Sequence, residues 1–153
     1  MIGRIFQRAL LVLSLLALPA SAEDSSQNKT ADGVSVYIGV LPAEMLLGHP
    51  RGHHKREMHG GVPAGAGRYH VVVAVFDAAS SRRIADAEVR IGGASIGMAP
   101  ARKKAETMLI NSLVTYGNYV SMPGPGPYKI QVEIRRPGHK PVELEFDYPF
   151  ART

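Results

Sequence analysis

The run YHVVVAVF at residues 69–76 decides the fold of this chain. It is rich in β-branched residues and apolar in both side-chain phases, which is typical of a strand in the centre of a sandwich. Because successive side chains of a strand point to opposite faces, one phase should face the core. That phase consists of Val71, Val73 and Val75. Since the other phase is also apolar, we expect Val72 and Ala74 to be largely buried as well.

Two further runs alternate strictly between apolar and polar residues. They are YKIQVEIR at residues 128–135 and VELEFDY at residues 142–148, and each predicts a strand with one buried face. The core residues expected from the alternating phases are Val71, Val73, Val75, Val89, Ile91, Ile130, Val132, Ile134, Leu144 and Phe146.

Weaker strand signals lie at residues 34–40, 84–91, 107–110 and 118–122, with Gly92 and Gly93 expected to interrupt the strand before them. Residues 41–48 fit a single helical turn. About seven short strands with turn signals roughly every ten residues are typical of a sandwich. The sequence therefore predicts an all-β fold, an Ig-like antiparallel β-sandwich.

The first 22 residues read as a secretory signal. Arg4 and Arg8 precede an apolar run at residues 9–18, and small residues at 20–22 follow Pro19. The apolar run is about half the ~20 residues that a membrane span needs, which disfavours a membrane anchor. We expect cleavage after Ala22 and a periplasmic location.

The remaining chain has the length of one domain. We expect a flexible N-terminus at 23–33, a strand and a loop rich in His and Gly at 34–67, and the sandwich at 68–150. The sequence has no cysteine, so any soft metal ligand must be Met or His. Loss of the two signal-peptide arginines lowers the net charge of +5 by two. This weakly basic balance does not indicate nucleic-acid binding.

The loop at residues 49–67 is the first candidate metal site. His49, His53, His54, Met58 and His59 lie close together there. Imidazole suits copper, zinc, nickel and iron, and thioether suits Cu(I). We expect His53, His54 and His59 to chelate an ion weakly. The spacing matches no structural zinc pattern. Neighbouring basic residues would repel a cation, so a solvated loop with incidental histidines is the alternative.

Catalytic signals are missing from the sequence. It has no thiol nucleophile, and its one Gly-x-Ser-x-Gly match, GASIG at residues 93–97, does not lead into a predicted helix as a nucleophile elbow does. Its acidic residues mostly fall on the polar phase of alternating strands, and no glycine-rich phosphate loop leads into a helix. We therefore expect a protein that is not an enzyme.

The stretch MLINSLVTYGNYVSMPGPGPYKIQVEIRRP at residues 108–137 resembles the second half of the periplasmic iron-transport accessory proteins. Those are small Ig-like, cupredoxin-like dimers that bind copper and assist iron uptake. The positions that fit the family frame are Met108, Tyr116, Gly117, Met122, Gly126, Tyr128 and Pro137. The resemblance implies that Met108 is a metal ligand.

One position departs from the family frame. Thr115 stands where the family has a metal-binding histidine, and a hydroxyl is a poor copper ligand. Either this chain has lost the metal, or another imidazole replaces the missing one. The candidates are His70 and the loop histidines His53, His54 and His59.

Two functions follow as expectations. The first is an exported, non-enzymatic accessory to iron or copper handling, with His70, Met108 and Met122 as ligands on the sandwich. Its expected partners are an inner-membrane transporter or another envelope protein, and a second copy in a homodimer. The second is a metal-free structural or protein-interaction module, in which His70 is an ordinary strand-end histidine and the methionines fill the core.

Overall fold

The computed structural model describes residues 27–47 and 61–149. The expected signal segment with its cleavage after Ala22, and the loop residues His49, His53, His54, Met58 and His59, lie outside the described residues. In the described ranges no helix is long and apolar enough to cross a membrane.

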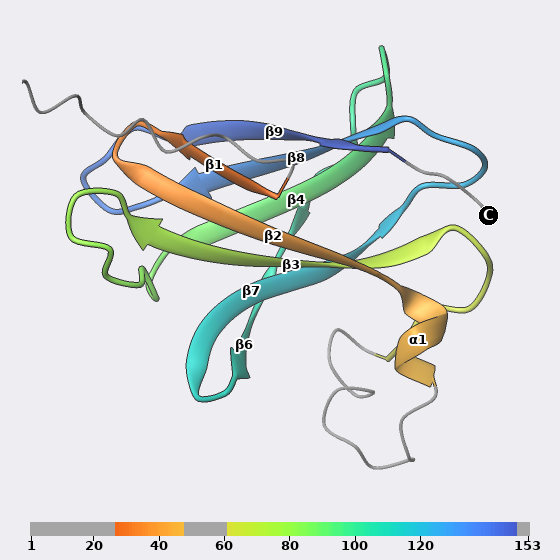
Figure 1. Ribbon diagram of the computed structural model, residues 1–153, viewed down its shortest axis with the longest axis horizontal. Coiled ribbons are helices and arrows are strands. Elements are labelled where there is room, and N and C mark those ends of the chain that lie inside the picture. Colours follow the sequence, from red (N-terminus) through yellow and green to blue (C-terminus); the bar gives the residue numbers. More distant parts are fainter. Residues whose placement is uncertain (1–26, 48–60, 150–153) are drawn as a thin grey trace, which may run out of the picture.

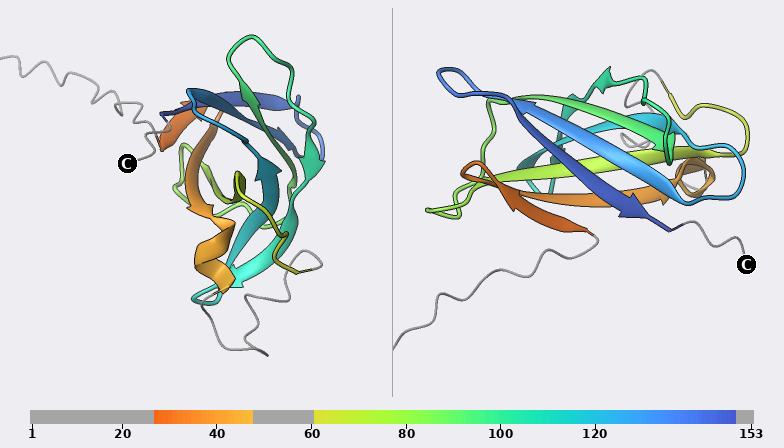
Figure 2. Two further views of the ribbon diagram at one scale, coloured as in Figure 1. Left: turned by 90° about the vertical axis from the view of Figure 1, so that its right-hand side faces the viewer. Right: turned by 90° about the horizontal axis from the view of Figure 1, so that it is seen from above.

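Two antiparallel sheets pack face to face as a sandwich (Figures 1 and 2). The five-stranded sheet has the order β1-β2-β3-β7-β6. Its strands are β1 (Asn28–Ala31), β2 (Val34–Pro42), β3 (Arg68–Asp77), β7 (Leu113–Ser121) and β6 (Glu106–Ile110). The four-stranded sheet has the order β5-β4-β8-β9. Its strands are β5 (Lys103–Lys104), β4 (Glu88–Ser95), β8 (Tyr128–Arg135) and β9 (Val142–Tyr148). The predicted β-sandwich is thus confirmed, and the helical turn is α1 (Ala43–Leu47).

The inner phases of both sheets form one core. All ten residues predicted for it are buried, so the alternation identified the inner phase correctly. The prediction for the other phase of β3 was wrong, because Val72 and Ala74 are only partly buried. They lie on the outer face of the five-stranded sheet, which no second sheet covers in the described ranges.

Other differences concern short or glycine-containing segments. Residues 28–31, expected in a flexible N-terminus, form β1 on the edge of the sheet. Strand β4 begins only at Glu88 and runs through Gly92 and Gly93. A Cβ at Gly92 would lie 2.8 Å from Cβ of Pro100, and one at Gly93 would lie 3.1 Å from the Met122 side chain. The glycines therefore admit close neighbours without ending the strand.

The hairpin between β6 and β7 fixes the register on which the candidate site depends. Its two loop residues, Asn111 and Ser112, both have positive φ, at 50° and 64°. This is the backbone of a type I′ turn, whose twist matches that of the flanking strands. The hairpin places Met108 opposite Thr115. On its other side β7 pairs with β3, with Val73 opposite Tyr116.

Candidate metal site

Three neighbouring strands bring His70 and Met108 together on the outer face of the five-stranded sheet. His70 on β3 is opposite Tyr119 on β7, and Met108 on β6 is opposite Thr115. Residues directly opposite one another in a ladder share a face of the sheet. Gly117 lies between Thr115 and Tyr119 in the same phase of β7, so it separates the two candidate ligands.

Gly117 provides the space into which both side chains project. A Cβ at this position would lie 2.6 Å from Cε and 3.3 Å from Sδ of Met108, and 3.1 Å from Nε2 of His70. The sulfur and the ring nitrogen therefore both lie within 3.3 Å of one point above the sheet. Any larger residue at 117 would displace one or both of them.

The pair is buried although it lies on an outer face. His70 is 3% exposed and Met108 is 6% exposed. The His70 ring packs on the Tyr119 ring with centroids 5.0 Å apart and a 41° tilt. Tyr119 in turn forms a small apolar cluster with Ala43 and Leu46 of α1, against which Val62 packs. Helix α1 and the segment before β3 thus cover this end of the sheet.

Two buried neighbours of the pair, Tyr119 and Thr115, are uncharged. Burial raises the pKa of the Tyr119 hydroxyl, which keeps it neutral near pH 7. Thr115 is buried, and its hydroxyl donates a hydrogen bond to the Leu113 carbonyl at 3.3 Å. The position where the family resemblance implies a histidine is thus occupied by a locally bonded hydroxyl, which leaves His70 as the imidazole beside Met108.

Met122 does not join this pair. It is fully buried in the sandwich core, in the same cluster as Tyr116 and Val120. Its sulfur would lie 3.1 Å from a Cβ at Gly93, which belongs to the opposite sheet. Met122 therefore lies on the inner side of β7, whereas Met108 and His70 lie on the outer side. Its position is that of a residue that fills the core.

Glu106 is a neighbour that the sequence reasoning did not single out. It is opposite Gly117 in the ladder between β6 and β7 and is exposed. It shares a phase with Met108, two residues along β6, so its carboxylate stands beside the pair. The Glu-x-Met spacing on a short strand was the available signal. No group of three or more His, Cys, Asp or Glu able to hold a metal occurs in the described part of the chain.

Comparison with known proteins gives a match in fold. No family model matches the chain, and no curated protein matches it in sequence. A DUF4426 family protein from Pseudomonas aeruginosa aligns over 81% of this chain and 93% of its own, with a TM-score of 0.62 and 8% identity. A copper-bound variant of FetP from uropathogenic Escherichia coli aligns over 80% of this chain and 92% of its own, with a TM-score of 0.57 and 16% identity.

A third structure is a copper-bound variant of Campylobacter jejuni P19. It aligns over 80% of this chain and 94% of its own, with a TM-score of 0.57 and 12% identity. At such identities the likeness establishes the β-sandwich fold and nothing finer.

Proposed function

We propose that this protein is an exported, non-enzymatic metal-binding accessory of the periplasm that holds Cu(I) between His70 and Met108. The observation that carries the proposal is the convergence of the Met108 sulfur and His70 Nε2 over Gly117. The similarity in fold to copper-bound structures supports it, as does the signal-like N-terminal sequence.

The two donors suit a soft monovalent ion. Thioether favours Cu(I), and imidazole accepts copper in either oxidation state. Nitrogen and sulfur donors bind metals such as zinc at roughly 2.0–2.3 Å, so the Met108 sulfur and His70 Nε2 would both have to turn toward one ion. Two neutral donors leave coordination positions open, which is the property of a protein that passes an ion on rather than storing it.

Further donors are available around the pair. Glu106 lies beside it on β6. The described residues on both sides of the His-rich loop, Leu46 and Val62, pack in the cluster around Tyr119, next to His70. We propose that His53, His54 or His59 adds an imidazole to the site. Iron as the transported ion and an inner-membrane transporter as partner follow from the family resemblance and belong to the same proposal.

The decisive experiment is anaerobic Cu(I) titration of the mature protein against a competing chelator. Met108→Leu nearly conserves volume, so stability should change by less than ~1.5 kcal/mol. The loss of the sulfur should weaken Cu(I) binding at least tenfold. Met122→Leu is the matched control, since the same change in the core should leave copper affinity unaltered. Equal titrations of Met108→Leu and the wild type would show that Met108 is packing alone.

The loop histidines are tested in the same assay. A variant with His53, His54 and His59 changed to Ala should bind copper more weakly, with the difference fading below about pH 6, where free imidazoles protonate. An isotherm identical to that of the wild type would remove the loop from the site.

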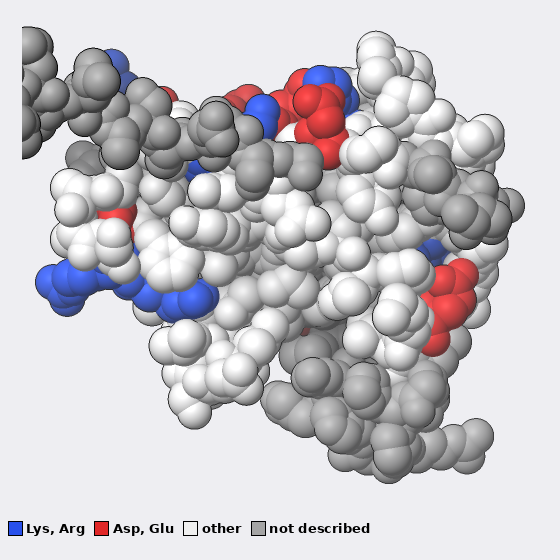
Figure 3. Space-filling view, viewed as in Figure 1, with Lys and Arg blue, Asp and Glu red and all other residues white. Residues whose placement is uncertain are grey.

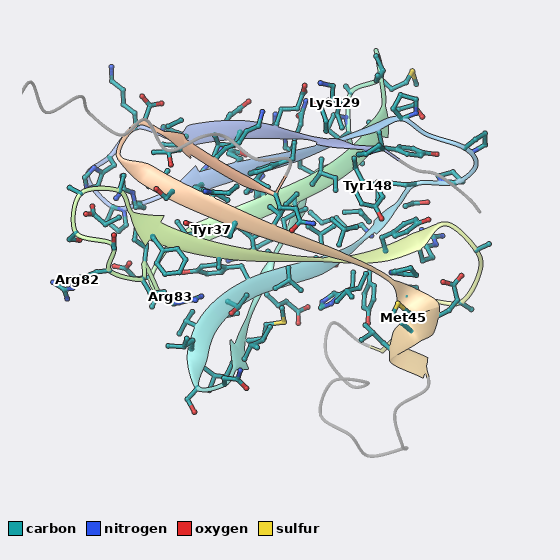
Figure 4. All side chains as sticks on the ribbon, viewed as in Figure 1. Tyr37, Met45, Arg82, Arg83, Lys129 and Tyr148 are labelled. Carbon is teal, nitrogen blue, oxygen red and sulfur yellow. The ribbon has the colours of Figure 1, made fainter. Side chains whose placement is uncertain are left out.

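A metal-free interaction module is the second candidate function. The observation in its favour is the exposure of Tyr37, Leu41 and Leu113 on the same sheet, and of Met45 on α1. In Figure 4, Tyr37 on β2 and Met45 on α1 lie toward opposite ends of the five-stranded sheet. Exposed apolar side chains on a surface that no sheet covers in the described ranges are candidates for docking a partner. A protein that binds no copper and captures an envelope partner through Tyr37 would support this candidate.

A further inference from the structure

Beside the candidate metal site the sandwich has an open corner. Strand β6 pairs with β7 only as far as Gly117, so within the described chain residues 118–121 of β7 have no ladder partner on that side. Strand β5 of the other sheet approaches there, and the Asn118 side chain donates a hydrogen bond of 2.8 Å to the Lys104 carbonyl. The two sheets are bridged at this point but not closed beyond it.

A pocket of about 190 Å³ occupies the corner. Arg68, Lys103, Tyr119 and Ser121 contribute to its lining. The volume is below the roughly 300–1,000 Å³ of pockets for drug-sized ligands, so an occupant must be small. Tyr119 is shared with the metal site, because its ring packs on His70.

The two cations of the pocket differ from four other cations of the described chain. Arg90, Arg102, Lys129 and Arg135 each form ion pairs with acidic side chains. Within residues 27–47 and 61–149, neither Arg68 nor Lys103 forms one. Glu106, which begins β6, is not among the residues that line the pocket. The corner therefore concentrates positive charge that no carboxylate of the described chain neutralises.

Backbone geometry adds a donor to these cations. The Met122 N–H donates to the Gly67 carbonyl at 2.8 Å, toward β3. Successive residues of a strand direct their N–H and C=O groups to opposite sides, so the Ser121 N–H and C=O both point away from β3, toward the open edge. The Ser121 hydroxyl is a second neutral donor in the lining. Charged and neutral donors around a small pocket match the acceptor oxygens of an anion.

We propose that this corner is a binding site for a small oxyanion, of the carboxylate or phosphate class, next to the metal site. Arg68 and His70 are two residues apart in one phase of β3, roughly 7 Å along the strand. The uncompensated cations oppose a copper ion at that distance, and a bound anion offsets them. Anion binding stands on its own, whereas its coupling to copper rests on the proposed function.

The test uses the mature protein without metal at low ionic strength, titrated calorimetrically with citrate and, separately, with inorganic phosphate. The site is supported if either probe binds, Arg68→Gln weakens that binding at least tenfold and Lys103→Gln weakens it severalfold. The probe that binds more tightly shows whether the anion is of the carboxylate or the phosphate class. Lys140→Gln is the control, because this exposed lysine lies outside the pocket. No binding of either probe, or equal binding by Arg68→Gln and the wild type, overturns the proposal.

Copper coupling is measured with the same probes. The tighter anion should raise Cu(I) affinity roughly threefold or more, as expected for opposite charges at this range in a partly screened setting. Met108→Leu should retain wild-type anion binding. A protein that binds the anion but no copper would thus contradict the proposed function alone. Anion binding that Arg68→Gln leaves unchanged would contradict only the oxyanion site.

Discussion

The outer faces of the two sheets differ in how they meet water. On the four-stranded sheet, polar side chains pair with one another. Arg102 contacts Glu143 at 2.9 Å, and Lys129 contacts Asp147 at 2.6 Å. On the five-stranded sheet the same outward phase holds exposed Tyr37, Leu41 and Leu113 and buries His70 and Met108.

The surface view shows part of this contrast. In Figure 3 the centre of the visible face is largely uncharged, and charged side chains gather toward its margins. Lys129 lies at the upper margin in the matching stick view (Figure 4). Alternation along a strand predicts that one set of side chains points outward, but it does not predict the role of those side chains. The ion-paired face is an ordinary solvated surface, whereas the apolar face carries the features that need a functional explanation.

The largest expected effect separates the inner and outer faces of β3. Val73→Asp places an unpaired charge in the core, which should reduce the free energy of unfolding by several kcal/mol. Val72→Asp changes the adjacent, partly exposed residue and should cost far less. Urea denaturation of both variants measures the difference. Equal losses would show that the outer face is as closed to water as the core.

The next effect separates two arginines of the charged sheet. Arg102 is partly buried and contacts Glu133, which is 5% exposed. Arg102→Leu leaves that carboxylate with Arg135 alone and should cost about 1–3 kcal/mol. Arg90→Leu removes an exposed pair with Glu88 and should cost less than about 0.5 kcal/mol. Similar losses in thermal unfolding would contradict the distinction.

Acidification should weaken the charged face selectively. Hydrogen bonding and charge from Arg102 lower the pKa of Glu143 below its ordinary 4.5, and Lys129 lowers the pKa of Asp147 below its ordinary 3.8. A lowered folded-state pKa stabilises the fold above the ordinary value, and this contribution is lost as the pH falls through the folded-state value. The melting temperature should therefore drop below about pH 4.5. Lys129→Met should flatten that drop, and an unchanged pH profile would argue against the pairing.

The smallest effect on stability is expected on the apolar face. Leu113→Ser alters an exposed side chain and should change the free energy of unfolding by less than about 0.5 kcal/mol. Tyr37→Ser also removes the edge-to-face contact of its ring with Phe76, at 5.5 Å between centroids, and should cost about 1 kcal/mol. If this face docks a partner or a second copy, the same variants should weaken that association, measured by sedimentation. A large loss of stability in the isolated protein would instead make these residues part of the fold.

The fold could be predicted from sequence to the extent that apolar periodicity encodes it. The runs at 69–76, 128–135 and 142–148 became β3, β8 and β9. Strand β1 was missed because its residues, NKTA, have no apolar phase and pair only along the edge of β2. The glycines of β4 were misinterpreted because their neighbours, Pro100 and Met122, come from distant segments.

The site shows the same limit. His70 and Met108 were both named from sequence as candidate ligands, yet their approach over Gly117 depends on the register of three strands. Met122 was grouped with them because it fits the family frame and carries a thioether. Its place on the inner side follows from the alternation of side chains along the strand. A shift of one residue would have placed it on the outer side. Whether the pair binds metal stays a prediction.

The pairing of β3 with β7 also has a consequence for folding kinetics. Its ladder joins Val73 to Tyr116, and β4 must likewise await β8. Such contacts between distant segments require long loops to close before they stabilise anything, so folding takes milliseconds to seconds rather than microseconds. The contacts that assemble the candidate site therefore form only after those loops have closed.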